Sequence, residues 1–159
     1  MTWDEFTTNV RQWSTERGIY EHSTAVAQAL KACSEAGELC DAVIKGDREA
    51  MIDAVGDVAV CVVNTATMHS CAISLDADYI DDGICLEHGA ARVAVYCAMA
   101  AEDICTGGMA DASLQEVLWS LQDICRSNGL EFLECCESAW LTIKDRRGKM
   151  VAGGAFVKE

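Results

Sequence analysis

The chain has 159 residues, 51% of them hydrophobic, and a formal net charge of −14 at pH 7. This length suits one domain with a sizeable core, and the absence of proline favours long, uninterrupted helices. The acidic balance excludes the basic surface that nucleic acid or an anionic membrane would need, so we expect neither as a partner.

Helical patterns follow one another along the chain and predict an all-α fold. We expect helices at roughly 2–16, 23–44, 48–69, 85–104, 113–127 and 130–145, with a short helical turn at 74–78. Ser23 and Ser113 are the expected caps of two of them. The tail at 146–159 contains glycines and β-formers that could make a small hairpin. We divide the single domain into halves at about 1–82 and 83–145, followed by this tail.

Ten cysteines could indicate disulfides or zinc, but no two of them are spaced as CxxC. Most lie on apolar helical faces, where cysteine behaves as a small hydrophobic residue. The start, MTWDEFTTNV, shows no apolar signal region. We therefore expect free thiols and a cytoplasmic protein.

The second predicted helix carries four polar residues within one arc, because residues three, four and seven apart share a helical face: Gln28, Lys31, Glu35 and Glu38. Taken alone, this pattern is typical of a solvated polar face. The third predicted helix is different, since valine, alanine and cysteine surround its whole circumference and predict burial on nearly all sides. Asp53, Asp57 and Asn64 nevertheless lie on one narrow arc of it.

Buried acids facing two glutamates across a helical hairpin need balancing charge, because an uncompensated buried charge costs several kcal/mol. Lys31 and Lys45 could pair with two of the four acids. Divalent cations could balance all four, and a site made of carboxylate oxygens suits Mg²⁺ or Mn²⁺.

These residues carry a family resemblance. Glu35-x-x-Glu38, a spacer, and then GDVAVCVVNTA at 56–66 resemble the ExxE…GD…N signature of the MazG-like, all-α nucleoside triphosphate pyrophosphohydrolases. The stretch RQWSTERG at 11–18 and the tail AWLTIKDRRGKMVAGGAFVKE at 139–159 resemble phage-type members. The resemblance covers roughly 3–80 and 130–159, whereas 85–125 looks like an insertion or a degenerate repeat of the first hairpin.

The resemblance implies a helical bundle that hydrolyses a nucleoside triphosphate to the monophosphate and pyrophosphate with two or three Mg²⁺ or Mn²⁺ ions. It implies catalysis by Glu35 and Glu38, with Glu35 orienting the attacking water, and metal binding by Glu35, Glu38, Asp53 and Asp57. The implied substrate-binding residues are Lys31, Asn64, Lys144 and Arg147.

The chain departs from the family pattern at two positions, because Ser34 replaces a glutamate and Ala54 replaces an acid three residues before Asp57. Asp53 could substitute for the acid missing at Ala54.

Two alternatives remain open. The chain could be an all-α dUTPase or dCTPase with the same carboxylate site, or a non-catalytic acidic scaffold. Phage relatives that act on one deoxynucleotide favour dGTP as the first substrate to test. The apolar helix faces predict a homodimer or homotetramer.

Overall fold

The computed structural model describes residues 1–75, 83–154 and 156–158, and it confirms the predicted all-α bundle. The helical turn expected at 74–78 falls mostly on 76–82, which lie outside the described residues. The described elements are, in order, α1 (Trp3–Glu16), α2 (Ile19–His22), α3 (Ala25–Lys45), α4 (Arg48–His69), α5 (Leu86–Cys105), α6 (Asp111–Ser127), α7 (Phe132–Ile143), β1 (Gly148–Met150) and β2 (Phe156–Lys158).

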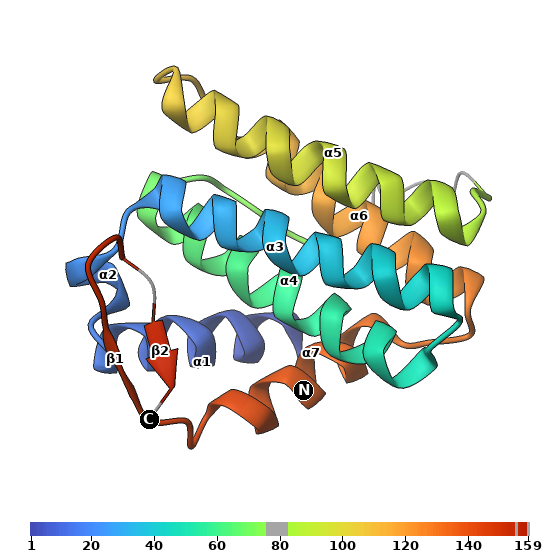
Figure 1. Ribbon diagram of the computed structural model, residues 1–159, viewed down its shortest axis with the longest axis horizontal. Coiled ribbons are helices and arrows are strands. Elements are labelled where there is room, and N and C mark those ends of the chain that lie inside the picture. Colours follow the sequence, from blue (N-terminus) through green and yellow to red (C-terminus); the bar gives the residue numbers. More distant parts are fainter. Residues whose placement is uncertain (76–82, 155, 159) are drawn as a thin grey trace.

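Helix α4 is the central helix of the bundle and packs against α3, α7, α1 and α6 (Figure 1). Buried residues surround it between Met51 and Ala66, as its uniformly apolar sequence predicted. By length and composition α4 could cross a membrane, but 72% of its most apolar window is buried inside the bundle. Packing within the bundle therefore accounts for its hydrophobicity.

Gly56 allows α4 and α7 to approach closely. A Cβ atom added to Gly56 would lie 2.5 Å from the Ala139 Cβ and 2.5 Å from the carbonyl oxygen of Cys135. Only a residue without a side chain fits this contact, because a backbone carbonyl cannot move aside as a flexible side chain can. The glycine of the GD pair thus has a packing role in this chain.

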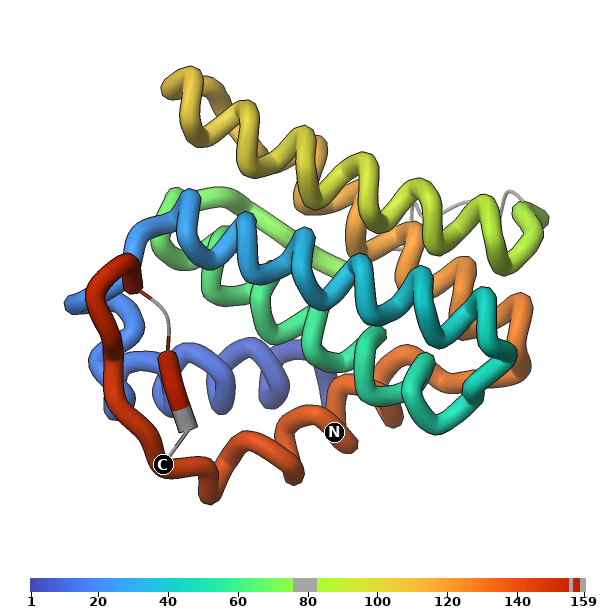
Figure 2. The backbone as a smooth tube through the Cα atoms, viewed as in Figure 1, coloured from blue at the N-terminus to red at the C-terminus, as the bar shows by residue number. Residues whose placement is uncertain are grey.

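Two helical hairpins lie side by side in the bundle (Figures 1 and 2). The turn at 46–47 joins α3 to α4, the segment 106–110 joins α5 to α6, and α5 packs along α3. An ion pair of 2.7 Å between Arg92 and Glu116 links α5 to α6. The region 85–125 therefore covers the outer side of α3 as a second helical layer.

Two of the predicted helix caps were wrong. Thr24, one residue after Ser23, caps α3 by accepting a hydrogen bond from the Ala27 N–H. Helix α6 begins at Asp111, so Ser113 lies inside its first turn. The Ser113 hydroxyl instead donates a 2.7 Å hydrogen bond to Asp103, which ties α6 to the end of α5.

The C-terminal tail forms the predicted hairpin, in which β1 and β2 pair antiparallel. Arg17 holds the start of the tail by donating a 3.0 Å hydrogen bond to the carbonyl oxygen of Arg146. Gly154, at φ +80°, packs so closely on Ser23 that an added Cβ would lie 3.0 Å from it. The tail therefore lies against the segment that joins α2 to α3. The sequence did not predict the short α2, and α7 is shorter than the predicted helix at 130–145.

All ten cysteines are free thiols, as predicted. Five are buried, and only Cys85 and Cys105 are exposed. The buried thiols belong to the hydrophobic core, where they pack as small apolar side chains.

Candidate functional site

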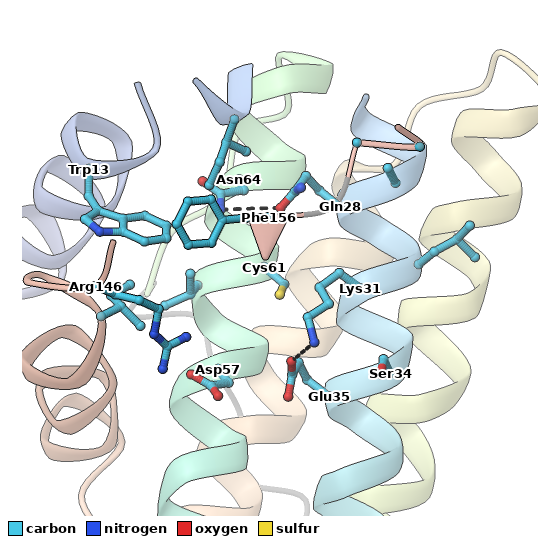
Figure 3. A pocket seen from close by; sticks show the side chains of 17 residues that line it. Trp13, Gln28, Lys31, Ser34, Glu35, Asp57, Cys61, Asn64, Arg146 and Phe156 are labelled. Atoms are coloured by element: carbon cyan, nitrogen blue, oxygen red, sulfur yellow. Dashed lines mark hydrogen bonds and ion pairs between the residues drawn. The ribbon is translucent and has the colours of Figure 1, made fainter. Parts of the chain in front are cut away.

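A cavity of about 410 Å³ lies between α3 and α4 and is bordered by α1, α2, Ile143 at the end of α7 and the C-terminal tail (Figure 3). This volume is within the usual range of small-molecule pockets. Among the described residues, none from α5 or α6 lines it. The cavity therefore draws on the first half of the chain and the tail, and the second hairpin supports it only from outside.

Glu35 and Lys31 occupy the charged end of the cavity. The Glu35 carboxylate is buried, with 6% of the residue exposed, and it contacts the Lys31 ammonium one helical turn earlier on α3. Burial by itself would lower the pKa of Lys31, but the hydrogen bond and the negative charge of Glu35 outweigh burial and raise it. Lys31 therefore stays charged at neutral pH beside the cavity.

Asp57 lies on α4 across the cavity from Glu35 (Figure 3). Burial, followed by the charge of Glu35, raises the pKa of Asp57 to about 6; Asp53 adds to this effect and Arg146 opposes it. Within the described part of the chain, no hydrogen bond or ion pair engages the Asp57 carboxylate. The ionised form of Asp57 is therefore disfavoured, mainly by burial and then by the charge of Glu35.

Glu38 and Asp53 are both exposed and do not line the cavity. Because α3 and α4 run in opposite directions, each lies about one turn beyond its partner acid, towards the turn that joins the two helices. The expected burial of Asp53 was wrong, since a step of one turn brings it, like Glu38, to the open end of the hairpin. They still act electrostatically, because Asp53 raises the pKa of Asp57 and Glu38 helps to raise that of Lys31.

The donor chemistry of the site fits a divalent cation. Among the described residues, no group of three or more histidine, cysteine, aspartate or glutamate side chains is arranged to hold a metal ion. Glu35 and Asp57 nevertheless offer hard oxygen ligands to one cavity. Burial and the charge of Glu35 disfavour ionised Asp57, and a bound Mg²⁺ or Mn²⁺ would stabilise its ionised form. The larger ligand set, with Glu38 and Asp53, stays a prediction.

Arg146 is the arginine that lines the cavity, whereas the predicted Lys144 and Arg147 are exposed and do not line it. Its guanidinium points towards Asp57 (Figure 3). Within the described chain the guanidinium makes no hydrogen bond or ion pair, while Arg17 holds the Arg146 backbone in place. A guanidinium held this way is a suitable donor for phosphate oxygens.

An amide pair lies at the other end of the cavity. Asn64 is 2% exposed, and its Oδ1 accepts hydrogen bonds from the Ser14 hydroxyl at 2.7 Å and from the Tyr20 hydroxyl at 2.9 Å. Its Nδ2 lies 3.5 Å from Gln28 Oε1, and Gln28 Nε2 donates to the Ser23 hydroxyl at 3.0 Å. Helices α1 and α2 thus fix the orientation of an amide that belongs to α4.

Two aromatic rings border this amide end. Trp13 of α1 and Phe156 of the tail meet edge to face, with 5.6 Å between their ring centres. The Arg17 guanidinium lies 5.8 Å from the centre of the Trp13 ring. Trp13 is buried, and its indole N–H has no hydrogen-bond partner among the described residues. The cavity therefore has an apolar aromatic wall next to its amide pair.

The structure brings together four of the eight predicted site residues, Lys31, Glu35, Asp57 and Asn64. Four further residues line the site that were not predicted from the sequence: Trp13, Gln28, Arg146 and Phe156. Gln28 shares the helical arc of Lys31 and Glu35, which was an available signal. The other three lie in the two end segments that carried the family resemblance, but no pattern in the sequence singled them out.

Comparison with known proteins gives one partial similarity. The chain is 38% identical over 55 residues to a protein of Haemophilus phage HP1 described as an uncharacterized 18.2 kDa protein in the rep-hol intergenic region. The matched stretch covers 35% of this chain and 34% of the phage protein. No protein-family model matches the chain, and no solved structure matches it significantly.

Proposed function

We propose that this protein hydrolyses a (deoxy)nucleoside triphosphate to the monophosphate and pyrophosphate, with Mg²⁺ or Mn²⁺ bound at the carboxylate end of the cavity. One observation carries the proposal: Glu35 and Asp57 face each other in a cavity that also contains two cations, Lys31 and Arg146. This combination offers ligands to a metal and contacts to a phosphate chain at the same place. The resemblance to the MazG-like enzymes points to the same chemistry.

Each charged residue of the cavity would have its own role in the reaction. Glu35 and Asp57 would hold the cation, with Glu38 and Asp53 recruited from one turn away. The bound cation would neutralise charge on the phosphates and lower the pKa of a water molecule. Glu35, buried and held by Lys31, would orient that water towards the α-phosphorus. Lys31 and Arg146 would bind the phosphate oxygens, and the bond to the pyrophosphate leaving group would break.

The test is a panel of nucleoside triphosphates, with dGTP first, assayed with Mg²⁺ or Mn²⁺ for pyrophosphate and for orthophosphate separately. We expect a monophosphate and pyrophosphate. Glu35→Gln and Asp57→Asn should each reduce turnover at least a hundredfold, because each removes a metal ligand. Asp41→Asn, which changes an exposed acid of α3, is the matched control.

Three outcomes would lead to different conclusions. A diphosphate product with orthophosphate would contradict cleavage at the α position. Hydrolysis confined to dUTP or dCTP would favour the dUTPase or dCTPase type. No hydrolysis of any nucleotide, together with a melting temperature that ignores nucleotide, would favour the acidic scaffold.

We also propose a homodimer or homotetramer that acts in the cytoplasm, in the host cell if the gene is of phage origin. Exposed apolar side chains of α3 and α5 support self-association: Leu30 and Ile44 are 58% and 82% exposed, and Val95 and Met99 are 54% and 44% exposed. The partial similarity to a phage protein supports the phage origin. A sedimentation mass near 17 kDa at micromolar concentration would exclude the oligomer.

A further inference from the structure

We infer that the amide end of the cavity is a nucleobase site, in which the Gln28–Asn64 pair binds the edge of the base and Phe156 borders its ring. The identity of the ligand rests on the proposed function. The base site lies at the end of the cavity that does not bind the phosphates, and its residues come from three separate segments of the chain.

The orientation of the Asn64 amide is fixed. Two hydroxyl groups, those of Ser14 and Tyr20, donate to its Oδ1 and occupy both lone pairs. The Nδ2 group therefore points to Gln28, where the hydrogen bond is long at 3.5 Å. A hydrogen bond this long leaves the Nδ2 group able to donate to a ligand at little cost.

Gln28 completes the recognition element. Its Nε2 donates to Ser23, which turns Oε1 towards Asn64. The pair thus presents an N–H donor and a carbonyl acceptor next to each other. A nucleobase edge that has an acceptor next to a donor can bond to both groups. A phosphate group has only acceptors and cannot.

The separation of the two ends fits a nucleotide. Asp57 and Asn64 are seven residues apart on α4, which corresponds to two helical turns and about 10 Å. The cations and carboxylates lie at one end, and the amide pair and the aromatic rings lie at the other (Figure 3). A nucleotide also carries its charge and its planar ring at opposite ends of a sugar. Phe156 comes from β2, so the C-terminal hairpin forms one wall of the base site.

The experiment compares Gln28→Ala with Gln12→Ala, which changes an exposed glutamine of α1 that bonds only Glu16 among the described residues. Binding of the four deoxynucleoside monophosphates is measured by calorimetry, which needs no turnover. The kcat/KM values for the four triphosphates and for an abasic deoxyribose triphosphate are then determined. Gln28→Ala should reduce discrimination between the best and the worst base about tenfold or more, with the abasic compound unaffected. Gln12→Ala should match the wild type.

Two further variants separate recognition from folding. Phe156→Ala should weaken monophosphate binding about tenfold, whereas Val157→Ala, at the exposed neighbouring position, should not. Tyr20→Phe removes one of the hydroxyl groups that orient Asn64. It should raise KM for the preferred base with little change in kcat, while Tyr96→Phe on α5 should leave both constants unchanged.

These measurements distinguish a wrong assignment of the base site from a wrong assignment of the enzyme activity. Base-dependent binding that Gln28→Ala abolishes, without hydrolysis of any triphosphate, would support the base site and contradict the enzyme. Hydrolysis with the same base preference in Gln28→Ala as in the wild type would overturn the base site and leave the enzyme standing. Equal binding of all four monophosphates and the abasic compound by the wild type would also overturn the base site.

Discussion

Ionised Asp57 should destabilise the protein when no cation is bound, and Asp57→Asn tests this directly. Burial and the charge of Glu35 raise the pKa of Asp57 from 3.8 to about 6. A carboxyl group with a raised pKa favours the folded state when it is protonated, so its ionisation costs stability as the pH rises from about 4 to about 6. At 1.36 kcal/mol per pH unit, the loss is on the order of 3 kcal/mol and is complete above pH 6.

Urea unfolding of the wild type and of Asp57→Asn in EDTA, at several values between pH 4 and pH 7.5, measures this effect. The difference in the free energy of unfolding should be close to zero at pH 4 and should grow to about 3 kcal/mol in favour of the variant at pH 7.5. Asp41→Asn, at an exposed acid paired with Lys45, should differ from the wild type by less than about 0.5 kcal/mol throughout. A variant that is no more stable than the wild type at pH 7.5 would refute the electrostatic account of the site.

Three further predictions concern packing and charge. Gly56→Ala should cost about 2 kcal/mol or more in urea unfolding, because its Cβ would collide with the Cys135 carbonyl, whereas Gly37→Ala, with open space around it, should be neutral or stabilising. Arg146→Ala should raise the dissociation constant of a nucleoside triphosphate about tenfold or more in titration calorimetry, and Arg147→Ala should change it little. Asp53→Ala should remove nearly all turnover and weaken Mn²⁺ binding with the fold intact; a near-wild-type rate would remove Asp53 from the site.

The sequence predicted the fold well because the helices depend on local patterns. The apolar residues around the whole circumference of α4 predicted its burial. The glycines and capping residues predicted most helix ends to within two residues. The errors have local causes. Both Ser23 and Thr24 can cap a helix, and only packing selects between them. Ser113 follows Asp111 so closely that the first turn of α6 could begin at either residue, and the bond from Ser113 to Asp103 is a tertiary contact that no local pattern contains.

The candidate site was harder to predict than the fold. The burial of a side chain depends on how far along the helix the rest of the bundle covers it, and helical spacing does not contain that information. Glu38 and Asp53 satisfy the same helical spacing as Glu35 and Asp57, yet one turn towards the hairpin loop exposes them. The basic run in the tail contains several cations, and spacing alone could not identify Arg146 as the one that enters the cavity. The tertiary contacts that place the tail, such as the hydrogen bond from Arg17 to the Arg146 carbonyl oxygen, join residues 129 positions apart, and no local pattern contains them.

The balance of charge in the cavity leads to a final prediction. Among the described residues, its charged lining consists of two carboxylates, Glu35 and Asp57, and two cations, Lys31 and Arg146, so these formal charges cancel when Asp57 is ionised. Cys61, which also lines the cavity, stays neutral because burial raises its pKa well above the usual range. The exposed acids Glu38 and Asp53 then leave the surroundings negative, and a triphosphate would add still more negative charge. A nucleotide should therefore enter this cavity only together with divalent cations.

Titration calorimetry of the wild type can check this requirement without turnover when the triphosphate carries a non-hydrolysable imido group between its α- and β-phosphorus atoms. A triphosphate should bind at least a hundredfold more weakly in EDTA than with Mn²⁺. A tenfold change in the dissociation constant corresponds to 1.4 kcal/mol, so a modest electrostatic repulsion is enough for this loss. In the Asp57→Asn protein the repulsion from the cavity is smaller, so binding in EDTA should improve while the gain from Mn²⁺ shrinks. Equal affinity with and without the cation in the wild type would mean that Lys31 and Arg146 are enough to bind the triphosphate, and it would contradict metal binding by the two carboxylates.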